Sequence, residues 1–231
     1  MEKVVILTGA GISAESGIST FRDAGGLWEG HDIMEVASPQ GWAKNQALVL
    51  DFYNKRRKQL KEVTPNPAHL ALKELEQHYA VSIVTQNVDD LHERAGSKNI
   101  IHLHGELTKS RSTKKSNLVY DCQKDILLGD YCELGSQLRP HIVWFGEEVP
   151  MLEQAAKVTS QADHILIVGT SMQVYPAASL IAYARQFASI YYIDPKPSIN
   201  YELSQMKQLK VLAEKATIGV RKVVDDLLKD K

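Results

Sequence analysis

Two histidines, His102 and His104, stand with one residue between them at the end of a short apolar run, and His104 directly precedes Gly105. Imidazole has an unperturbed pKa of about 6.5, close to neutral pH, which suits it to general acid–base chemistry. Most histidines lie on the surface or are satisfied in the core, so the residue type alone assigns no role. The position at a strand end before a glycine favours His104 as a base, with His102 as its weaker rival.

Amide and carboxylate side chains follow another apolar run. Gln86, Asn87 and Asp89 come directly after an expected strand at 81–85, at the end where side chains of a parallel sheet reach over a bound ligand. These groups offer both donors and acceptors of hydrogen bonds. A polar turn capped by Asn and Asp side chains is the alternative interpretation.

A glycine-rich loop follows the first apolar run, residues 4–8. It matches the G-x-G-x-x-G/A pattern of dinucleotide-binding loops through Gly9, Ala10, Gly11, Ile12, Ser13 and Ala14. The glycines permit a tight turn and close approach to a diphosphate, and the start of a following helix supplies donors. A dehydrogenase of this type has a second strand ending in Asp or Glu about 20 residues later. No strand-like run stands there, so the pattern indicates nucleotide binding and disfavours hydride transfer.

Short apolar runs alternate with amphipathic stretches along most of the chain. Further strands are expected at 100–103, 164–168, 189–193 and 209–212, and helices at 67–78, 176–188 and about 220–227. Continuous apolar strands between helices are typical of a parallel sheet covered on both faces. The predicted fold is α/β, a Rossmann-like doubly wound parallel sheet.

Two segments break the alternation, at about 31–64 and 107–140. The first is polar and aromatic with a helical pattern near 48–61, and the second is polar and weakly patterned. Both are interpreted as insertions at the ends of the sheet that form a small module. The whole chain, 1–231, is then a single domain whose large part comprises about 1–30, 65–106 and 141–231.

Composition limits the class of protein. The chain has 231 residues, with 27 Lys and Arg against 28 Asp and Glu, a balance that argues against wholesale binding of nucleic acid or an anionic membrane. No apolar run approaches the ~20 residues that span a bilayer, and the N-terminus lacks the features of a secretory signal. Two cysteines make no disulfide framework. A cytoplasmic protein is expected.

Five motifs together resemble the sirtuins, a family of NAD-dependent protein-lysine deacylases. They are GAGISAESGISTFRDAGGLW at 9–28, TQNVDDLHERAG at 85–96, LHGEL at 103–107, WFGE at 144–147 and GTS at 169–171. The resemblance covers nearly the whole chain, in the family's order and spacing. It implies a bacterial-type enzyme that uses NAD as a co-substrate, removes acetyl, succinyl or malonyl groups from lysine, and releases nicotinamide and O-acyl-ADP-ribose.

The resemblance also implies the catalytic and NAD-binding residues. His104 matches the catalytic histidine, which in the family's scheme draws a proton from a ribose hydroxyl after the acyl oxygen has attacked the ribose carbon bearing nicotinamide. Gln86 matches a contact to that ribose, and Asn87, also counted as catalytic, and Asp89 match contacts to the nicotinamide end. The remaining implied cofactor positions are Gly9, Ala10, Gly11, Ile12, Ser13, Ala14, Phe21, Arg22, Trp28, Gly169, Thr170, Ser171, Asp194 and Ala216. At Asp194 the family usually has Asn.

Substrate positions follow from the same resemblance. Val143, Phe145, Gly146 and Glu147 match the extended segment against which the family lays its acylated peptide, by backbone hydrogen bonds that tolerate many sequences. The implied partners are therefore acylated proteins, with no need for nucleic acid or membrane. The sequence does not indicate an oligomeric state.

One pair resembles the residues of sirtuins that prefer succinyl or malonyl lysine. Tyr53 and Arg56 are three apart, so on a helix they share a face. In that class Arg meets the distal carboxylate, Tyr donates a hydrogen bond, and a small residue, here Ala37, leaves room for the longer acyl chain. A solvated basic face is the alternative, since Arg57, Lys58 and Lys61 follow.

The chain departs from the family at the metal site. Most sirtuins hold a structural zinc ion through four cysteines, whereas 107–140 offers only Cys122 and Cys132, and structural zinc needs four protein ligands. Recruitment of His141 and a carboxylate is the alternative. We expect no metal and a module held by apolar residues, among them Leu118, Val119, Ile126 and Leu127.

Two other functions stay open on sequence grounds. An NAD glycohydrolase or ADP-ribosyltransferase would use water or another nucleophile at the same ribose carbon and would need no acyl pocket. A non-catalytic NAD-sensing module would have no need of His104, Asn87 and Asp89 together.

Overall fold

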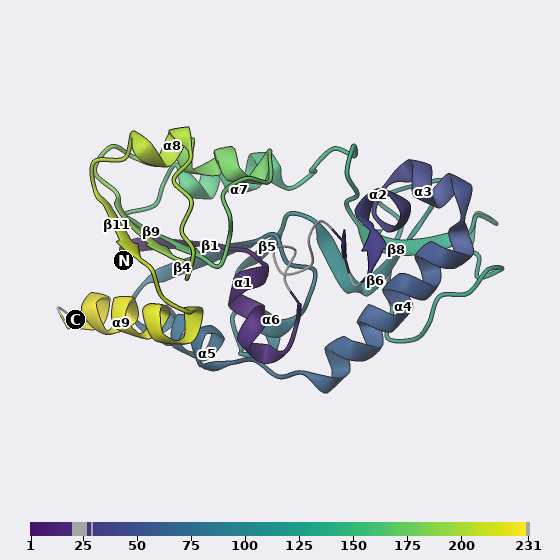
Figure 1. Ribbon diagram of the computed structural model, residues 1–231, viewed down its shortest axis with the longest axis horizontal. Coiled ribbons are helices and arrows are strands. Elements are labelled where there is room, and N and C mark those ends of the chain that lie inside the picture. The colour runs from purple at the N-terminus through teal and green to yellow at the C-terminus, as the bar shows by residue number, and fades with distance from the viewer. Residues whose placement is uncertain (20–26, 29, 230–231) are drawn as a thin grey trace.

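Six parallel strands form the main sheet, in the order β11-β10-β9-β1-β4-β5 (Figure 1). The computed structural model describes residues 1–19, 27–28 and 30–229. The strands are β1 Lys3–Thr8, β4 Ala80–Thr85, β5 Ile100–His102, β9 His164–Val168, β10 Ser189–Ile193 and β11 Leu209–Leu212. The predicted doubly wound α/β fold is confirmed. Because the chain moves outward from β1 in one direction and then from β9 in the other, the crevice beside these two strands is where such folds bind ligands.

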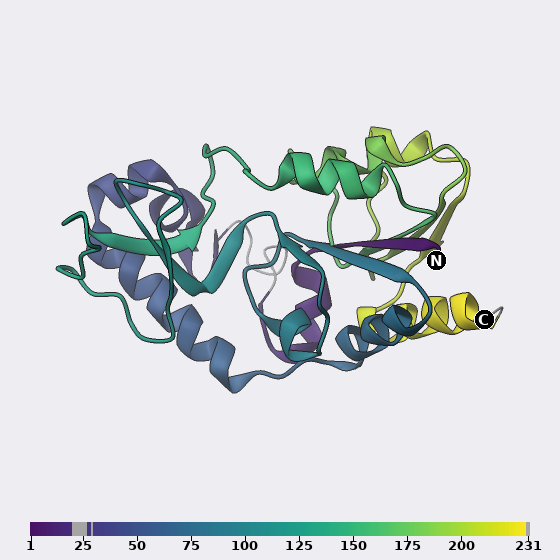
Figure 2. The same ribbon diagram turned by 180° about the vertical axis from the view of Figure 1, so that it is seen from behind.

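Helices cover both faces of this sheet (Figures 1 and 2). Alternate residues of β1 point to opposite faces: Val4 and Ile6 join one apolar cluster, and Val5 and Leu7 join the other. The first cluster includes residues of α5 Pro67–Glu74 and α9 Ala216–Leu228, and the second includes α7 Leu152–Thr159, η3 Ala177–Tyr183 and α8 Tyr201–Ser204. Among the described residues, no helix has both the length and the apolar character needed to cross a bilayer.

The remaining helices lie in the first half of the chain, and all but α4 are short. They are α1 Ala10–Ser13, η1 Ala14–Ser16, α2 Ile33–Val36, α3 Pro39–Lys44, α4 Gln46–Glu62, η2 Leu75–Gln77 and α6 Leu91–Arg94. Asp32, Ser38 and Asn45 each precede one of α2, α3 and α4 and accept a backbone N–H with their side chains, as N-cap residues do. The two-residue strand β3 His31–Asp32 begins the first insertion and pairs with β2 Leu27–Trp28, which precedes it.

The helix expected at 176–188 is wrong in type and extent. The structure has the 3₁₀-helix η3 over Ala177–Tyr183, which ends where the Ala184 N–H bonds to the carbonyl of Ile181. An i→i+3 bond of this kind closes a tighter turn than an α-helix makes. The proline at its start marks the helix correctly, but nothing in the apolar pattern distinguishes the two helix types.

The second insertion forms an antiparallel sheet that the weak sequence pattern does not predict. Its strands are β6 Gly105–Ser112, β7 Val119–Asp121 and β8 Leu138–Ile142, in the order β7-β6-β8. Together with α2, α3 and α4 they make up a small module that lies at the opposite end of the molecule from the two termini (Figure 2). Phe52 and Tyr53 of α4 pack with Leu107, Ile142 and Trp144 in its apolar cluster.

Polar side chains of α4 bind backbone groups of the second insertion and add to the apolar cluster that holds the module together. Of the four apolar residues expected to hold it, only Ile126 is buried; Val119 and Leu127 are exposed and Leu118 is half-buried. The Asn54 side chain donates to the Ile126 carbonyl and accepts its N–H, both at 2.9 Å. Arg57 Nε donates to the Leu107 carbonyl at 2.8 Å. These bonds satisfy backbone groups that would otherwise be buried without partners.

Two histidines are buried together beneath the sheet's carboxyl edge. His69 and His92 have ring centroids 4.9 Å apart, and His92 Nε2 lies 3.1 Å from the Thr8 hydroxyl. His69 Nδ1 accepts the Asn66 N–H. Burial lowers the pKa of His69 to about 4, and burial with the neighbouring histidines lowers that of His92 well below its usual value. Both rings are therefore neutral in the folded protein at neutral pH.

We expect the protein to lose stability as pH falls from about 6.5 towards 4. An unfolded histidine protonates near pH 6.5, whereas folded His69 resists protonation until about pH 4. Acid therefore favours the unfolded chain, by up to about 3 kcal/mol for this one residue. Urea unfolding at pH 7.5 and pH 5 should show a smaller difference for His69→Gln than for the unchanged protein. The exposed His78→Gln is the control, and equal pH dependence in all three proteins would contradict the assignment.

Candidate functional site

A cleft of about 750 Å³ opens where the carboxyl ends of the parallel strands face the small module. It brings together side chains that are as far apart in sequence as the first glycine loop and the start of α9. Most predicted site residues line it: Gly9, Ala10, Gly11, Ala14, Ala37, Tyr53, Arg56, Gln86, Asn87, Asp89, His104, Val143, Phe145, Gly146, Glu147, Gly169, Thr170, Ser171, Asp194 and Ala216.

A few predicted residues do not line the cleft or cannot be placed. Ile12 and Ser13 are fully buried beneath it, Ile12 within the apolar core of the sheet. Phe21 and Arg22 lie outside the described residues, and only the backbone of Trp28 is described, in β2. The rival histidine, His102, is not among the cleft residues.

The glycine loops after β1 and β9 touch each other directly. Gly11 N donates to the Gly169 carbonyl at 2.8 Å. A Cβ added to Gly11 would lie 2.6 Å from Gly169 Cα, and one added to Gly169, whose φ is 62°, would lie 2.3 Å from Ile12 N. Only glycine fits such an approach and such a backbone conformation.

The same contact corrects the expected source of hydrogen-bond donors. The helix α1 has only four residues, and Gly9 N, Gly11 N and Ile12 N already bond to Val168, Gly169 and Gly9 carbonyls. The start of this helix therefore offers fewer N–H groups to a phosphate than the sequence pattern implies. The glycines serve chiefly to bring the two loops within reach of one ligand.

The surroundings of His104 suit it to accept a proton. Its Nδ1 lies 3.0 Å from the Gln86 carbonyl, and because a carbonyl only accepts, Nδ1 carries the hydrogen and Nε2 carries the lone pair. Burial lowers the pKa of His104, although the bond to Gln86 opposes this. The ring is thus a neutral base at neutral pH, facing the cleft.

A chain of hydrogen bonds orients the polar groups after β4. Asn87 Nδ2 donates to the Ser13 hydroxyl at 3.1 Å, and that hydroxyl donates to Asp89 Oδ2 at 3.0 Å. Burial raises the pKa of Asp89, while bonds from the Leu91 N–H and Ser13 act in the other direction. The chain fixes which end of the Asn87 amide faces Ser13. Ser13 thus acts through Asn87 and Asp89.

Further polar contacts connect the strand ends across the cleft. Gln86 Nε2 donates to the Thr170 hydroxyl at 3.0 Å, which joins the loop after β4 to the loop after β9. Asp194, at the end of β10, is buried to 3% exposure and its Oδ1 accepts the Lys196 N–H at 2.8 Å. Three strand ends thus present polar groups to the same space.

The segment after β8 lies beside the cleft, but the expected extended form ends at Trp144, because Phe145 and Gly146 form a turn closed by the bond from Glu147 N to the Trp144 carbonyl at 3.0 Å. Val143 N donates to the His104 carbonyl and Phe145 N to the Ala37 carbonyl, both at 2.9 Å. Phe145 is 44% exposed. Glu147 accepts from Arg139 at 2.7 Å and from the Trp144 N–H at 2.8 Å, bonds that fix this turn. Its carboxylate therefore positions the segment from within the protein.

Ala37, Tyr53 and Arg56 lie at the module side of the cleft. The Trp144 indole N–H donates to the Tyr53 hydroxyl at 3.1 Å. Burial is the main cause that raises the pKa of Tyr53 above its usual value, so the phenol stays protonated and can donate. Arg56 is 8% exposed. Arg56 and Arg57 are both buried and so do not belong to a solvated basic face, whereas Lys58 and Lys61, which prompted that alternative, are exposed.

Several cleft residues were missed by sequence reasoning. Val174, Tyr175 and Pro176 line it directly after the GTS loop, with Val174 38% and Tyr175 57% exposed. Lys215, which precedes α9, and Val88 also line it. The only signal for the 174–176 segment is its place after a glycine loop, where apolar residues outside any periodic element are unusual.

The Sir2 family model matches residues 9–176. A relative from Helicobacter pylori named NAD-dependent protein deacylase is 67% identical over 196 residues, 85% of this chain and 84% of its own length. One of the same name from Bacteroides thetaiotaomicron is 49% identical over 229 residues, covering 96% and 97%. The chain therefore belongs to the Sir2 family.

Solved structures agree with this assignment. A crystal structure of a Sir2 homologue in complex with NAD matches with a TM-score of 0.88 and 40% identity over 99% of this chain and 90% of its own. A Sir2 mutant with a p53 peptide and NAD matches with a TM-score of 0.79 and 27% identity over 96% of this chain and 92% of its own. The motifs quoted from the sequence thus identify the family correctly.

Proposed function

We propose that this protein is an NAD-dependent protein-lysine deacylase that removes succinyl and malonyl groups as well as acetyl groups. Deacylation with NAD follows from membership in the Sir2 family and from relatives named for that activity. The breadth of acyl groups is the further step. It is carried by one observation: Ala37, Tyr53 and Arg56 line the same cleft as His104.

The cleft fits NAD by size and by the placement of its polar groups. At one part of the cleft the glycines of the loops after β1 and β9 have no side chains to obstruct a ligand. At another part Gln86, Asn87 and Asp89 offer hydrogen-bond acceptors and donors. When bound, NAD supplies a ribose carbon that loses nicotinamide. His104 accepts a ribose hydroxyl proton at Nε2, because Nδ1 stays bound to the Gln86 carbonyl.

An acylated peptide would lie along the segment after β8 that contains Val143 and Phe145. The bonds from these two residues to His104 and Ala37 carbonyls hold the segment in place before any peptide arrives. Exposed Val174 and Tyr175 form another part of the cleft lining. Backbone pairing with an extended peptide would give affinity with little dependence on its sequence. Acylated proteins of varied sequence are therefore the proposed partners.

The acyl end of the cleft has the chemistry that a dicarboxylic acyl group needs. Moving a carboxylate out of water is costly unless charged and hydrogen-bonding groups replace the water. Arg56 supplies a planar fork for two carboxylate oxygens, and Tyr53 is kept protonated by its burial. Acetyl-lysine has no distal carboxylate and gains nothing from either group.

Arg56→Met should lower kcat/KM for a succinyl-lysine peptide by roughly 10- to 100-fold, since a hydrogen bond to a charged group contributes about 1.5–3 kcal/mol. Deacetylation should stay within a few-fold. The products of both reactions are measured by mass spectrometry. Lys55→Met is the matched control, because Lys55 carries the same charge on the same helix but is exposed and paired with Asp51. Equal losses on both peptides would reject a carboxylate-reading role for Arg56.

His104→Ala should reduce deacylation by at least ~10²-fold, the usual contribution of a general base. NAD binding, measured by calorimetry, should change little because the ring's bond to the protein is made to a backbone carbonyl. His31→Ala, a change of the same type outside the cleft residues, serves as the control. Turnover near that of the unchanged protein would show that another group accepts the proton.

We also propose that the small module folds without zinc. Cys132 Sγ lies near the Ser112 and Ser136 hydroxyls, and Cys122 Sγ near the Lys124 carbonyl, while Asn54 and Arg57 bind backbone groups across the module. Elemental analysis of the purified protein should find well under one zinc per chain, and a chelator should leave activity unchanged. One zinc per chain together with loss of activity on chelation would overturn this.

A further inference from the structure

The loop after β4 is fastened to the segment 102–107 through three consecutive carbonyl groups. Each carbonyl accepts one hydrogen bond: Gln86 from His104 Nδ1 at 3.0 Å, Asn87 from His102 Nδ1 at 3.2 Å and Val88 from Leu107 N at 2.8 Å. Two of these donors have roles already described: His104 is the proposed base, and Leu107 N belongs to strand β6. The middle donor, His102, lies outside the cleft and has none.

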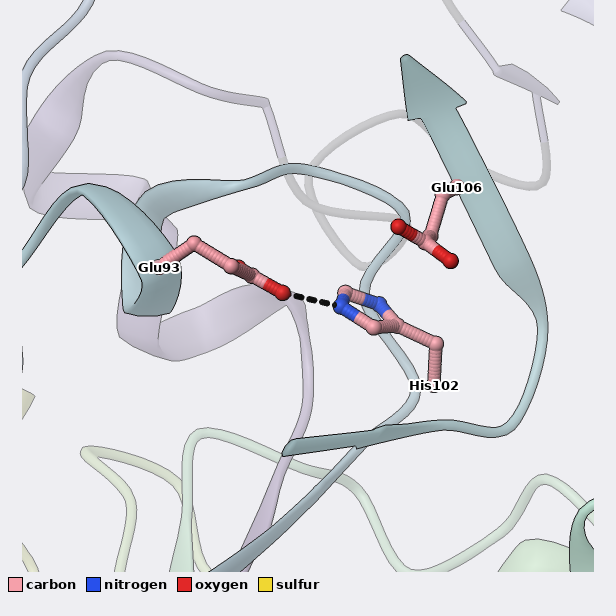
Figure 3. A group of neighbouring side chains, drawn as sticks. All are labelled: Glu93, His102 and Glu106. Carbon is pink, nitrogen blue, oxygen red and sulfur yellow. Dashed lines mark hydrogen bonds and ion pairs between the residues drawn. The ribbon is translucent and has the colours of Figure 1, made fainter. Parts of the chain in front are cut away.

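The His102 ring is placed between two acceptors. Nδ1 faces the Asn87 carbonyl, and Nε2 lies 2.6 Å from Glu93 Oε1 on α6. A carbonyl and an ionised carboxylate only accept, so both bonds are made at once only by the doubly protonated, charged ring. The Glu106 carboxylate faces the same ring from β6 (Figure 3). Burial lowers the pKa of His102, but Glu93, Glu106 and the Asn87 bond outweigh burial and raise it.

We propose that the Glu93–His102 ion pair is a positioning device for the part of the cleft that receives the nicotinamide end of NAD. His102 binds the Asn87 backbone carbonyl, while the Ser13 hydroxyl binds the Asn87 side-chain amide. The inference rests on the proposed function, because it takes NAD as the ligand of Asn87 and Asp89. His102 acts through Asn87 and has no contact with the cleft.

The charge on His102 adds a second effect. A cation near Asp89 favours the ionised form of that buried carboxylate, against the burial that raises its pKa. An ionised Asp89 accepts the Ser13 hydroxyl and keeps the chain to Asn87 in one orientation. The two histidines of this segment therefore have different roles. His104 is neutral and accepts a proton, whereas His102 is charged and positions the loop after β4.

A metal ion is the competing interpretation of the same side chains. One ligand atom each of Glu93, His102 and Glu106 lies within 4.8 Å of the others. In the structure these groups already have partners, because Glu93 binds His102 and Glu106 accepts from Lys109 Nζ at 2.9 Å. Bonds of this kind satisfy both carboxylates without an ion, which favours the positioning role.

The test measures NAD and peptide constants separately, with an acetyl-lysine peptide that does not depend on Arg56. His102→Gln should raise KM for NAD about 10-fold, and Glu93→Gln about 3-fold because the bond to Asn87 survives. The inhibition constant of nicotinamide should rise in parallel, and KM for the peptide should stay within 2-fold. The double variant should be no worse than His102→Gln, since both changes remove one device. Glu153→Gln, an exposed glutamate on α7, is the matched control.

Other outcomes overturn the proposal. Parallel loss of NAD affinity, peptide affinity and unfolding free energy in Glu93→Gln would mean a structural role only, and unchanged constants in both variants would mean no role. Inhibition by added Zn²⁺ that disappears in His102→Gln would establish a metal site instead. Failure of the proposed function is a separate result: the unchanged protein would then deacylate no peptide, although calorimetric NAD binding would still compare the variants.

Discussion

The direct contact between the Gly11 and Gly169 loops is the constraint on which the site depends. Parallel strands bring their carboxyl ends to one edge, but side chains normally keep neighbouring loops apart. Here backbone meets backbone, with 2.8 Å between Gly11 N and the Gly169 carbonyl. A larger residue at either position would separate β1 from β9 at the point where the strand order reverses. The contact between the two loops therefore sets the positions of the strand ends whose residues line the cleft.

Two imidazole rings in one short segment show how surroundings decide chemistry. His102 and His104 are separated by a single residue, and both bind a carbonyl of the loop after β4. Among the residues that the structure describes, His104 has no carboxylate partner, so burial dominates and its pKa falls. His102 has Glu93 at 2.6 Å, and its pKa rises despite burial. A residue type thus has no fixed protonation state, and the partner at the second ring nitrogen determines it.

Much of the fold and part of the cleft could be predicted from local signals. The buried strands are continuous apolar runs, and His104, Asn87 and Gly169 follow strand ends where the parallel topology requires functional groups. The sheet of 105–142 was not predictable, because its strands are mostly polar and their stability comes from distant partners. Asn54, for example, binds Ile126 across 72 positions of sequence. The roles of Ser13 and His102 were hidden for the same reason, since each depends on a partner fixed only by the folded backbone.

The helix α4 presents two sets of side chains on neighbouring faces. Tyr53 and Arg56 face the cleft, while Asn54 and Arg57, one position further along, bind the backbone of the β6–β8 insertion. Successive residues of a helix are rotated by about 100°, so the two pairs point in different directions from one helix. Under the proposed function, substitution of Arg56 changes which acyl group is removed, while Asn54 and Arg57 keep their bonds to the insertion. One helix thus carries both the residues that line the cleft and the residues that bind the insertion.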